Sequence, residues 1–220
     1  HPEYRRQRQM CIRDSTRSLR NFISRPGIEE ILEYRKTINQ RIIELSQSSN
    51  SNLDMIEVGC HHEMQHQELM LTDLQHGLSF NPTSPKYDPT KKDIENENIK
   101  QEWISFEKAI KNVGTNDEYF SFDCERPSHE VLILPFKISN KLVTNGEWIE
   151  FINNKGYNKS EYWLSDGFST CQQENWQSPL YWKKENSKWF HFTLNGSKEI
   201  DLNAPVSNIS YFEADAFARW

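Results

Sequence analysis

Apolar residues recur at helical spacing in the first third of the chain. From Pro26 onward they lie three or four positions apart, which predicts a helix that starts near Pro26 and Gly27. A polar loop is expected over 47–52. A second, longer helix is expected over 53–78, where Gly77 and a following Asn-Pro pair mark its end. The apolar positions that define the two helices are Ile28, Ile31, Leu32, Ile38, Ile42 and Leu45, then Leu53, Ile56, Leu71, Leu74 and Leu78.

The pattern changes after residues 86–101, a charged, Asn-rich segment with few apolar side chains that we interpret as a linker. Beyond it, short strand-like runs such as 131–134 alternate with aromatic-rich stretches that we expect to be irregular. Short helices are predicted near 145–153 and from Ser210, where Ser210 and Glu213 have the spacing of a capping box. This mixture predicts an α+β domain. The aromatic stretches are 176–182 and 189–192.

Composition and charge narrow the classes of protein. Hydrophobic residues make up 35% and aromatic residues 12% of the 220 residues, which is typical of a globular chain. The formal net charge of −6 gives a nucleic-acid partner no general electrostatic support, although seven arginines lie between His1 and Arg25. No apolar run approaches the roughly 20 residues of a membrane span, and the four cysteines form no CxxC pair. We therefore expect a cytoplasmic protein with free thiols, and partners that are neither nucleic acid nor membrane.

Both ends of the chain suggest a piece of a longer protein. The chain starts at His1 rather than Met, and it stops at Trp220 inside the helix predicted from Ser210. A helix that has just been capped would normally continue, so we expect the second domain to be incomplete. Residues 1–15 fit no pattern of secondary structure, and we expect them to be spurious or unstructured.

The segment 59–77 carries the candidate chemistry, because it concentrates imidazoles on one predicted helix. His62 and His66 are four residues apart, so both rings would project from one helical face and could share a metal ion. Gln65 and Asp73 fall within about a sixth of a turn of that face. Two solvated histidines on a polar face are the simpler alternative, and the spacing alone does not decide between the two.

Residues 62–66 read HEMQH, which is also a literal HExxH sequence. In zinc peptidases this helix supplies two ligands and a glutamate that acts as general base. The extended metzincin form would need glycine and histidine where this chain has Leu69 and Thr72. No later glutamate is evident as a third ligand, since the linker follows soon after. A peptidase with Glu63 as its base stays open as an alternative.

Ordered motifs are spread over 17–220. They are Ser24-Arg25-Pro26, Glu33-Tyr34-Arg35, HEMQHQEL from His62, Thr72-Asp73, Asn81-Pro82, WISF from Trp103, Asp123 with Glu125-Arg126-Pro127, Pro135-Phe136, VTNGE from Val143, WLSDG from Trp163, PLYW from Pro179, Ala204-Pro205-Val206 and Ser210-Tyr211. On these motifs the chain resembles the sulfoxide synthases of ergothioneine biosynthesis. The resemblance implies an α + (α+β) fold: a partial DinB-like four-helix bundle over 16–85, the linker at 86–101, and an incomplete C-type-lectin-like domain of the formylglycine-generating-enzyme (sulfatase-modifying-factor) type over 102–220.

The resemblance also implies a set of site residues. A non-haem iron(II) site of three histidines is expected, in which two match His62 and His66 and the third lies upstream of the sequence that can be matched. Gln65 is expected to contact an imidazole substrate. An Arg-x-x-Arg pair, matched by Arg17 and Arg20, is expected to hold the carboxylates of a thiol substrate. The tyrosine that handles protons in this family is expected beyond the last residue of the chain.

The implied activity is a step of ergothioneine biosynthesis, in which oxygen is used to join a thiol to hercynine and give a sulfoxide. The thiol is γ-glutamylcysteine or cysteine. Alternatives are a DinB-like hydrolase or thiol transferase that binds zinc or nickel, or a binding protein if the third histidine is absent. We expect residues 1–220 alone to be inactive and poorly folded, since half of a bundle leaves its apolar stripe uncovered.

Overall fold

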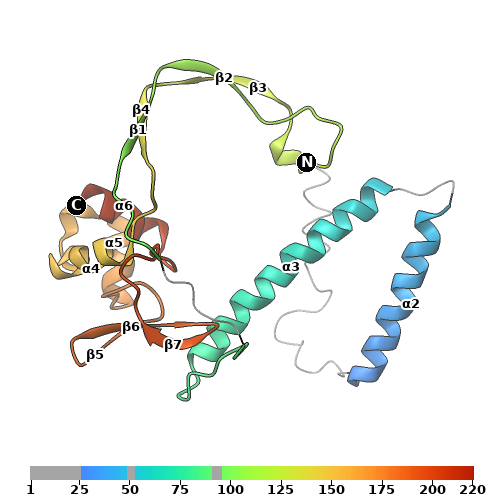
Figure 1. The fold of residues 1–220 in the computed structure, drawn as a ribbon, viewed down its shortest axis with the longest axis horizontal. Helices are drawn as coiled ribbons and strands as arrows, with labels where there is room; N and C mark the ends of the chain where they lie inside the picture. The colour runs from blue at the N-terminus through green and yellow to red at the C-terminus, as the bar shows by residue number, and fades with distance from the viewer. Residues whose placement is uncertain (1–25, 49–52, 91–95) are drawn as a thin grey trace. The chain divides into compact units, whose positions relative to one another are not determined.

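The structure is a computed structural model that describes residues 26–48, 53–90 and 96–220 (Figure 1). The chain divides into two compact units, residues 1–61 and 62–220, and each is described by itself. The first unit contains helix α2 (Ile28–Ser46) and the beginning of helix α3 (Leu53–Ser79), and the second contains the rest of α3 and all later elements. No helix in the described part of the chain is long and apolar enough to cross a lipid bilayer.

Helices α2 and α3 confirm the two helices predicted from apolar spacing. α2 begins after Gly27 and carries Glu29 and Glu30 in its first turn, where acidic side chains stabilise the positive end of the helix dipole. α3 runs without interruption for 27 residues and ends one residue beyond the predicted end. Neither helix has a buried residue among those described. The apolar stripes that made both helices predictable therefore remain at least partly exposed.

After the linker, four short strands form a long two-stranded antiparallel ribbon (Figure 1). β1 pairs with β4 and β2 pairs with β3, and residues 114–128 form the tip of the ribbon. β3 confirms the strand predicted at 131–134, although it begins two residues earlier and ends one residue earlier. The four strands are β1 (Trp103–Phe106), β2 (Ala109–Val113), β3 (His129–Ile133) and β4 (Phe136–Ser139).

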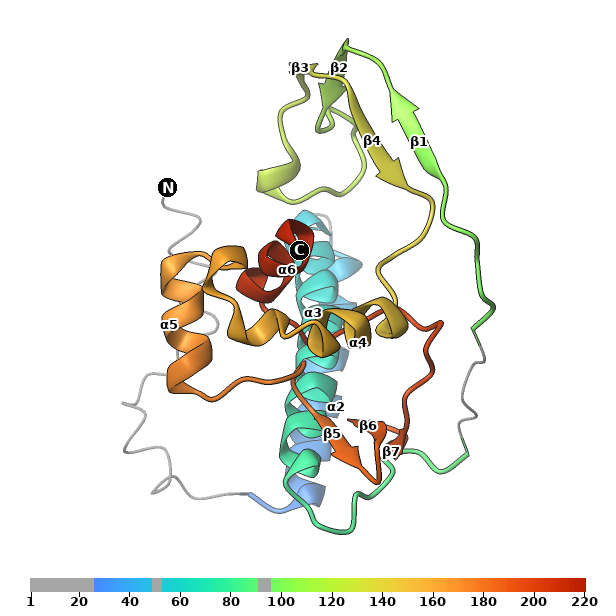
Figure 2. The ribbon, with the colours of Figure 1, turned by 90° about the vertical axis from the view of Figure 1, so that its left-hand side faces the viewer.

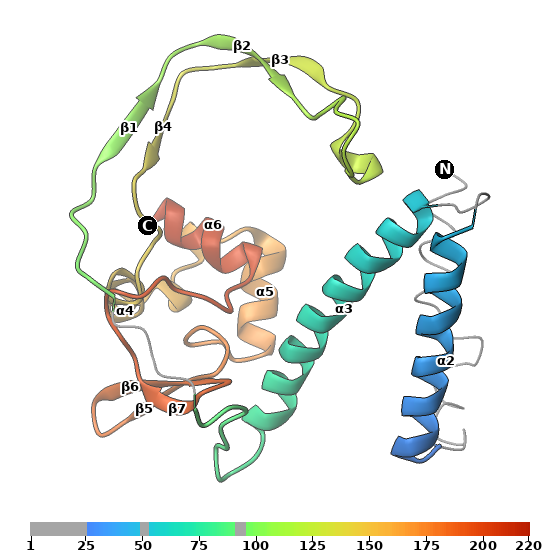
Figure 3. The same ribbon diagram turned by 45° about the vertical axis from the view of Figure 1, so that its right-hand side comes forward.

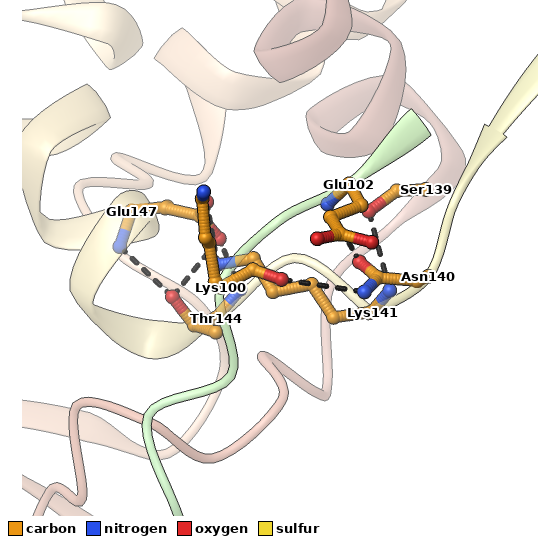
Figure 4. A network of polar contacts seen from close by, with 7 residues as sticks. All are labelled: Lys100, Glu102, Ser139, Asn140, Lys141, Thr144 and Glu147. Atoms are coloured by element: carbon orange, nitrogen blue, oxygen red, sulfur yellow. Dashed lines mark hydrogen bonds and ion pairs between the residues drawn. The ribbon is translucent and has the colours of Figure 1, made fainter. Parts of the chain in front are cut away.

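Asn140 ties the end of the linker to the end of the ribbon (Figure 4). Its amide oxygen accepts a hydrogen bond from the backbone N–H of Glu102 at 2.9 Å. Its side-chain NH₂ donates to the carbonyl oxygen of Lys100 at 3.2 Å, and its backbone N–H donates to the carbonyl oxygen of Glu102 at 3.0 Å. One side chain therefore fixes the start of β1 beside the end of β4.

The next helix starts from a capping box that an ion pair reinforces (Figure 4). Glu147, in the first turn of α4 (Asn145–Asn153), accepts hydrogen bonds from the backbone N–H and the hydroxyl of Thr144. The Lys141 ammonium lies 3.1 Å from the same carboxylate. Although partial burial opposes ionisation, these hydrogen bonds and the lysine charge hold the pKa of Glu147 below its ordinary value. α4 confirms the helix predicted near 145–153.

Two expectations for the second domain need correction. The aromatic stretch 189–192, expected to be irregular, lies in β6 (Lys188–Thr193), the middle strand of an antiparallel sheet with β5 (Trp182–Glu185) and β7 (Gly196–Glu199). Residues on both faces of β6 are partly or fully buried, so the strand shows no alternation of apolar and polar residues. Helix α5 (Ser165–Gln173) was not predicted, because its sequence SDGFSTCQQ is mostly polar.

The three helices α4, α5 and α6 (Tyr211–Arg219) enclose an aromatic core (Figure 2). α6 begins with the capping box predicted from Ser210 and Glu213. A Cβ atom on Gly167 would lie 2.6 Å from the ring of Phe212, so glycine is what lets α5 approach α6 this closely. The buried hydrophobic residues of this core are Trp148, Phe151, Tyr157, Trp163, Cys171, Trp182, Ile200 and Ala216.

Candidate functional site

The two histidines predicted to share a metal ion lie together on α3. Their ring centroids are 4.5 Å apart, and the Nε2 atom of His62 lies 3.2 Å from the Nε2 atom of His66. Both side chains are half-buried. The four-residue spacing on a continuous helix places the two rings one turn apart, where they meet edge to face. In the absence of a cation, one ring nitrogen can donate a hydrogen bond to the other.

This geometry fits two ligands of one metal ion. Metal–imidazole bonds of about 2.0–2.1 Å, at angles between octahedral and tetrahedral, place the two nitrogens roughly 2.9–3.4 Å apart. The observed 3.2 Å between the Nε2 atoms lies within that range. Within residues 26–48, 53–90 and 96–220, no group of three potential His, Cys, Asp or Glu ligands comes together.

Of the other predicted site residues, Gln65 is the one that lies within the described part of the chain. Gln65 is exposed on α3, next to His66 in sequence. Glu63, the base of the alternative peptidase, is also exposed on this helix. Arg17 and Arg20 lie outside the described residues.

A cleft of about 750 Å³ lies further along α3 and was not predicted from the sequence. Thr72 of α3 forms part of its lining, and the segment 175–182, at the start of β5, forms much of the remainder. Among the described residues, the lining contains aromatic, amide and hydroxyl side chains and one carboxylate, that of Glu213, and no Lys, Arg or His. Thr72 comes six residues after His66, roughly 9 Å along a helix.

The carboxylate at this cleft belongs to a buried polar network in the aromatic core. The hydroxyl of Tyr157 donates to Oε1 of Glu213 at 2.7 Å and accepts from the indole N–H of Trp148 at 3.2 Å. The other oxygen of Glu213 accepts from the backbone N–H of Ser210. Burial, and then the Glu213 charge and its hydrogen bond, raise the pKa of Tyr157 far above its ordinary value. Tyr157 therefore stays protonated and acts as a fixed donor.

Comparison with known proteins adds to this geometry. Residues 96–220, more than half of the chain, match the family model of the sulfatase-modifying factor enzyme 1-like domain. The chain belongs to this family. Residues 96–220, with their aromatic core and their capped helices α4 and α6, are therefore a sulfatase-modifying factor enzyme 1-like domain.

Relatives of this chain include proteins of ergothioneine biosynthesis. It is 36% identical over 111 residues to the hercynine oxygenase of Mycobacterium tuberculosis, and the aligned region covers 50% of this chain and 26% of the relative. It is 28% identical over 161 residues to the hercynine oxygenase of Mycolicibacterium thermoresistibile, covering 72% of this chain and 35% of the relative. It is 26% identical over 151 residues to ergothioneine biosynthesis protein 1 of Neurospora crassa, covering 61% of this chain and 17% of the relative.

These relatives confirm the family resemblance stated from the sequence motifs. The matched part of this chain spans about a third of their length or less. The match to the Mycolicibacterium protein extends over 161 residues, which is longer than the 96–220 domain, so it also includes residues outside that domain.

Proposed function

We propose that this chain is part of an iron(II)-dependent hercynine oxygenase, an oxidoreductase of ergothioneine biosynthesis. The reaction joins the sulfur of γ-glutamylcysteine or cysteine to the imidazole C2 of hercynine and uses one O₂. The imidazole C–H bond and the thiol S–H bond break, the C–S and S–O bonds form, and the second oxygen atom leaves as water. The substrates are small molecules, and the cytoplasmic location expected from the sequence is part of the proposal.

The observation that carries this proposal is the approach of the two Nε2 atoms to 3.2 Å on α3. His62 and His66 would hold the metal as neutral ligands, and a third histidine is expected upstream on the helical bundle. When bound, iron(II) supplies the one-electron redox chemistry that dioxygen requires, and three neutral imidazoles leave positions open for substrates. The names of the relatives favour this chemistry over a zinc peptidase with Glu63 as its base.

The chain's own residues would bind and orient the substrates. Gln65 precedes His66, and its side-chain amide can both donate to and accept from an imidazole. Arg17 and Arg20 would bind the carboxylates of the thiol, because the planar guanidinium matches carboxylate geometry. Both contacts would hold the thiol sulfur next to the imidazole C2. Such positioning supplies much of the rate enhancement of a two-substrate reaction.

The finer fold assignments belong to the same proposal. α2 and α3 would be two helices of a DinB-like four-helix bundle, and residues 102–220 would have a C-type-lectin-like fold. The apolar stripes at three- and four-residue spacing on α2 and α3 support the first assignment, since the helices of a bundle pack such stripes against one another.

The proposal can be tested with the complete protein that carries this sequence. After anaerobic loading with iron(II), it is mixed with hercynine, one of the two thiols and O₂, and the products are weighed by mass spectrometry. We expect an adduct with the mass of both substrates plus one oxygen atom less two hydrogen atoms. Oxidation of the thiol to its disulfide without a hercynine adduct would contradict the proposal, and the relative rates with the two thiols identify the donor.

A further inference from the structure

The last turn of α3 is fastened to the second domain by side chains that the proposed reaction does not use. The hydroxyl of Tyr181 lies 3.0 Å from Nδ1 of His76. The side-chain NH₂ of Gln75 lies 3.5 Å from the carbonyl oxygen of Phe192 in β6, a long hydrogen bond. Figure 3 shows the sheet β5–β6–β7 beside this end of α3. Both contacts lie within the second unit of the chain.

The chain that leaves α3 lies against the same sheet. The backbone N–H of Tyr87 donates to the carbonyl oxygen of Leu194 at 2.8 Å, in the turn between β6 and β7. A Cβ atom on Gly196 would lie 3.0 Å from the carbonyl oxygen of Ser84, so there is little space between this segment and the turn. The end of α3 is therefore held both by its own side chains and by the segment that follows it.

Tyr181 combines the contact to α3 with a left-handed backbone, a conformation that Ser84 in the segment after α3 also adopts. The Tyr181 φ of 70° lies in the left-handed region, which costs a non-glycine residue about 1–3 kcal/mol unless the surroundings enforce it. Its side chain lines the cleft that Thr72 of α3 also lines. Burial raises the pKa of Tyr181, so its hydroxyl stays protonated and can donate a hydrogen bond to Nδ1 of His76. A strained backbone at Tyr181, together with the contact of its hydroxyl with α3, indicates that the position of this hydroxyl matters.

We propose that Tyr181 is a positioning residue, whose hydrogen bond to His76 fixes helix α3, and with it His62 and His66, relative to the wall of the cleft. His76 follows His66 by ten residues, roughly 15 Å along the axis of a continuous helix, so movement at the last turn is transmitted to the ligands. This inference rests on the proposed function for its catalytic consequence. Positional errors of about 1 Å far from the reacting atoms can reduce turnover strongly.

The experiment compares Tyr181→Phe with the wild type in the complete protein that carries this sequence. Loss of one neutral hydrogen bond should make backbone amide exchange in residues 75–79 about two- to tenfold faster. The turnover number for sulfoxide formation should fall about tenfold, while iron(II) content stays at the wild-type level. Equal exchange rates, or an unchanged turnover number in an active enzyme, would overturn the proposal.

Two variants of His76 distinguish a positioning role of the hydrogen bond from a general effect on stability. His76→Leu removes the acceptor and should match Tyr181→Phe, and the double variant should be no worse than either single variant. His76→Asn keeps an acceptor oxygen and should stay within about twofold of the wild type. Asn is a poorer helix former than Leu, so this rescue cannot come from helix propensity. Additive single effects, or failure of Asn to rescue, would contradict the proposal.

The same set of variants distinguishes this inference from the proposed function. If the wild type makes no sulfoxide, the proposed function fails, and the hydrogen-exchange comparison still decides whether Tyr181 holds α3. If the wild type is active and all variants equal it, the proposed function stands and the positioning role is wrong.

Discussion

Helix α3 and the aromatic core of the second domain hold their polar groups in different ways. The His62 and His66 rings of α3 are half-buried on a helix without a single buried residue, and helical spacing alone brings them together. In the core, Tyr157 and Glu213 are almost fully buried, and a hydrogen bond joins them across 56 positions of the sequence. The helix thus presents groups that can take a ligand, whereas the core uses its polar groups to fix its own packing.

This difference implies that the chemistry and the stability of the protein can be changed separately. A substitution at the α3 face should change ligand binding with little effect on the core. A substitution in the core network should change the free energy of unfolding with little effect on metal affinity. The predictions that follow test this separation, beginning with the largest effect.

The largest expected effect comes from studying residues 1–220 alone. The exposed apolar stripes of α2 and α3 should lead to self-association, and sulfoxide formation should be undetectable. Size-exclusion chromatography and the product assay measure both properties. A monomeric, active chain would show that α3 and its site need nothing beyond these residues, and the contrast between helix and core would no longer hold.

The second prediction concerns the thiol substrate. Replacing Arg17 or Arg20 with Ala in the complete protein should raise the KM for the thiol about ten- to a hundredfold, which corresponds to about 1.5–3 kcal/mol for one charge-assisted bond. The KM for hercynine should stay nearly unchanged. Steady-state kinetics with each substrate varied in turn provides the measurement, with Arg41→Ala, at an exposed position of α2, as the matched control. Equal effects on the two KM values would assign the arginines a structural role.

The third prediction addresses the core. Tyr157→Phe removes the hydroxyl that connects Trp148 and Glu213, and leaves both without that buried partner. The free energy of unfolding should fall by about 1–3 kcal/mol. Urea denaturation followed by tryptophan fluorescence measures the loss, and an iron(II) titration of the folded variant should match the wild type. A large change in iron affinity would mean that core and metal site are coupled.

The smallest expected effect is at the start of α4. Lys141→Met removes the ion pair with Glu147 and should cost less than about 1 kcal/mol at neutral pH. Because the folded-state pKa of Glu147 is lowered, the stabilisation that this carboxylate contributes is complete above its ordinary pKa of 4.5 and is lost as the pH falls through the lower folded value. Lys141→Met should therefore reduce the loss of stability in acid. Denaturation curves at neutral and acidic pH provide the test, and an unchanged acid dependence would exclude this contribution of Lys141.

The sequence predicts well those features that depend on local spacing. The two long helices, the capping box at Ser210 and the juxtaposition of His62 and His66 all follow from a periodicity of three to four residues. The strand at 189–192 could not be recognised in this way, because both of its faces are covered. Helix α5 was not predicted for a related reason. It is mostly polar and has no apolar stripe, and it packs through a close contact at Gly167.

The contacts that join distant segments could not be predicted from one sequence. Tyr181 and His76 are separated by 105 residues, and no spacing rule connects them. The cleft beside them depends on the same tertiary packing. The sequence nevertheless contained a usable signal, because PLYW from Pro179 was among the motifs of the family resemblance.

The central claim is that His62 and His66 are two ligands of one iron(II) ion, and an anaerobic iron(II) titration of the complete protein tests it most directly. The wild type and His61→Ala, a control at the neighbouring residue, should each bind one iron(II) per chain with equal affinity. His62→Ala should weaken binding at least about a hundredfold, since it removes a direct ligand. Unchanged iron affinity in His62→Ala would contradict the claim. So would stoichiometric zinc together with a peptidase activity that Glu63→Ala abolishes, because the pair would then serve the alternative chemistry.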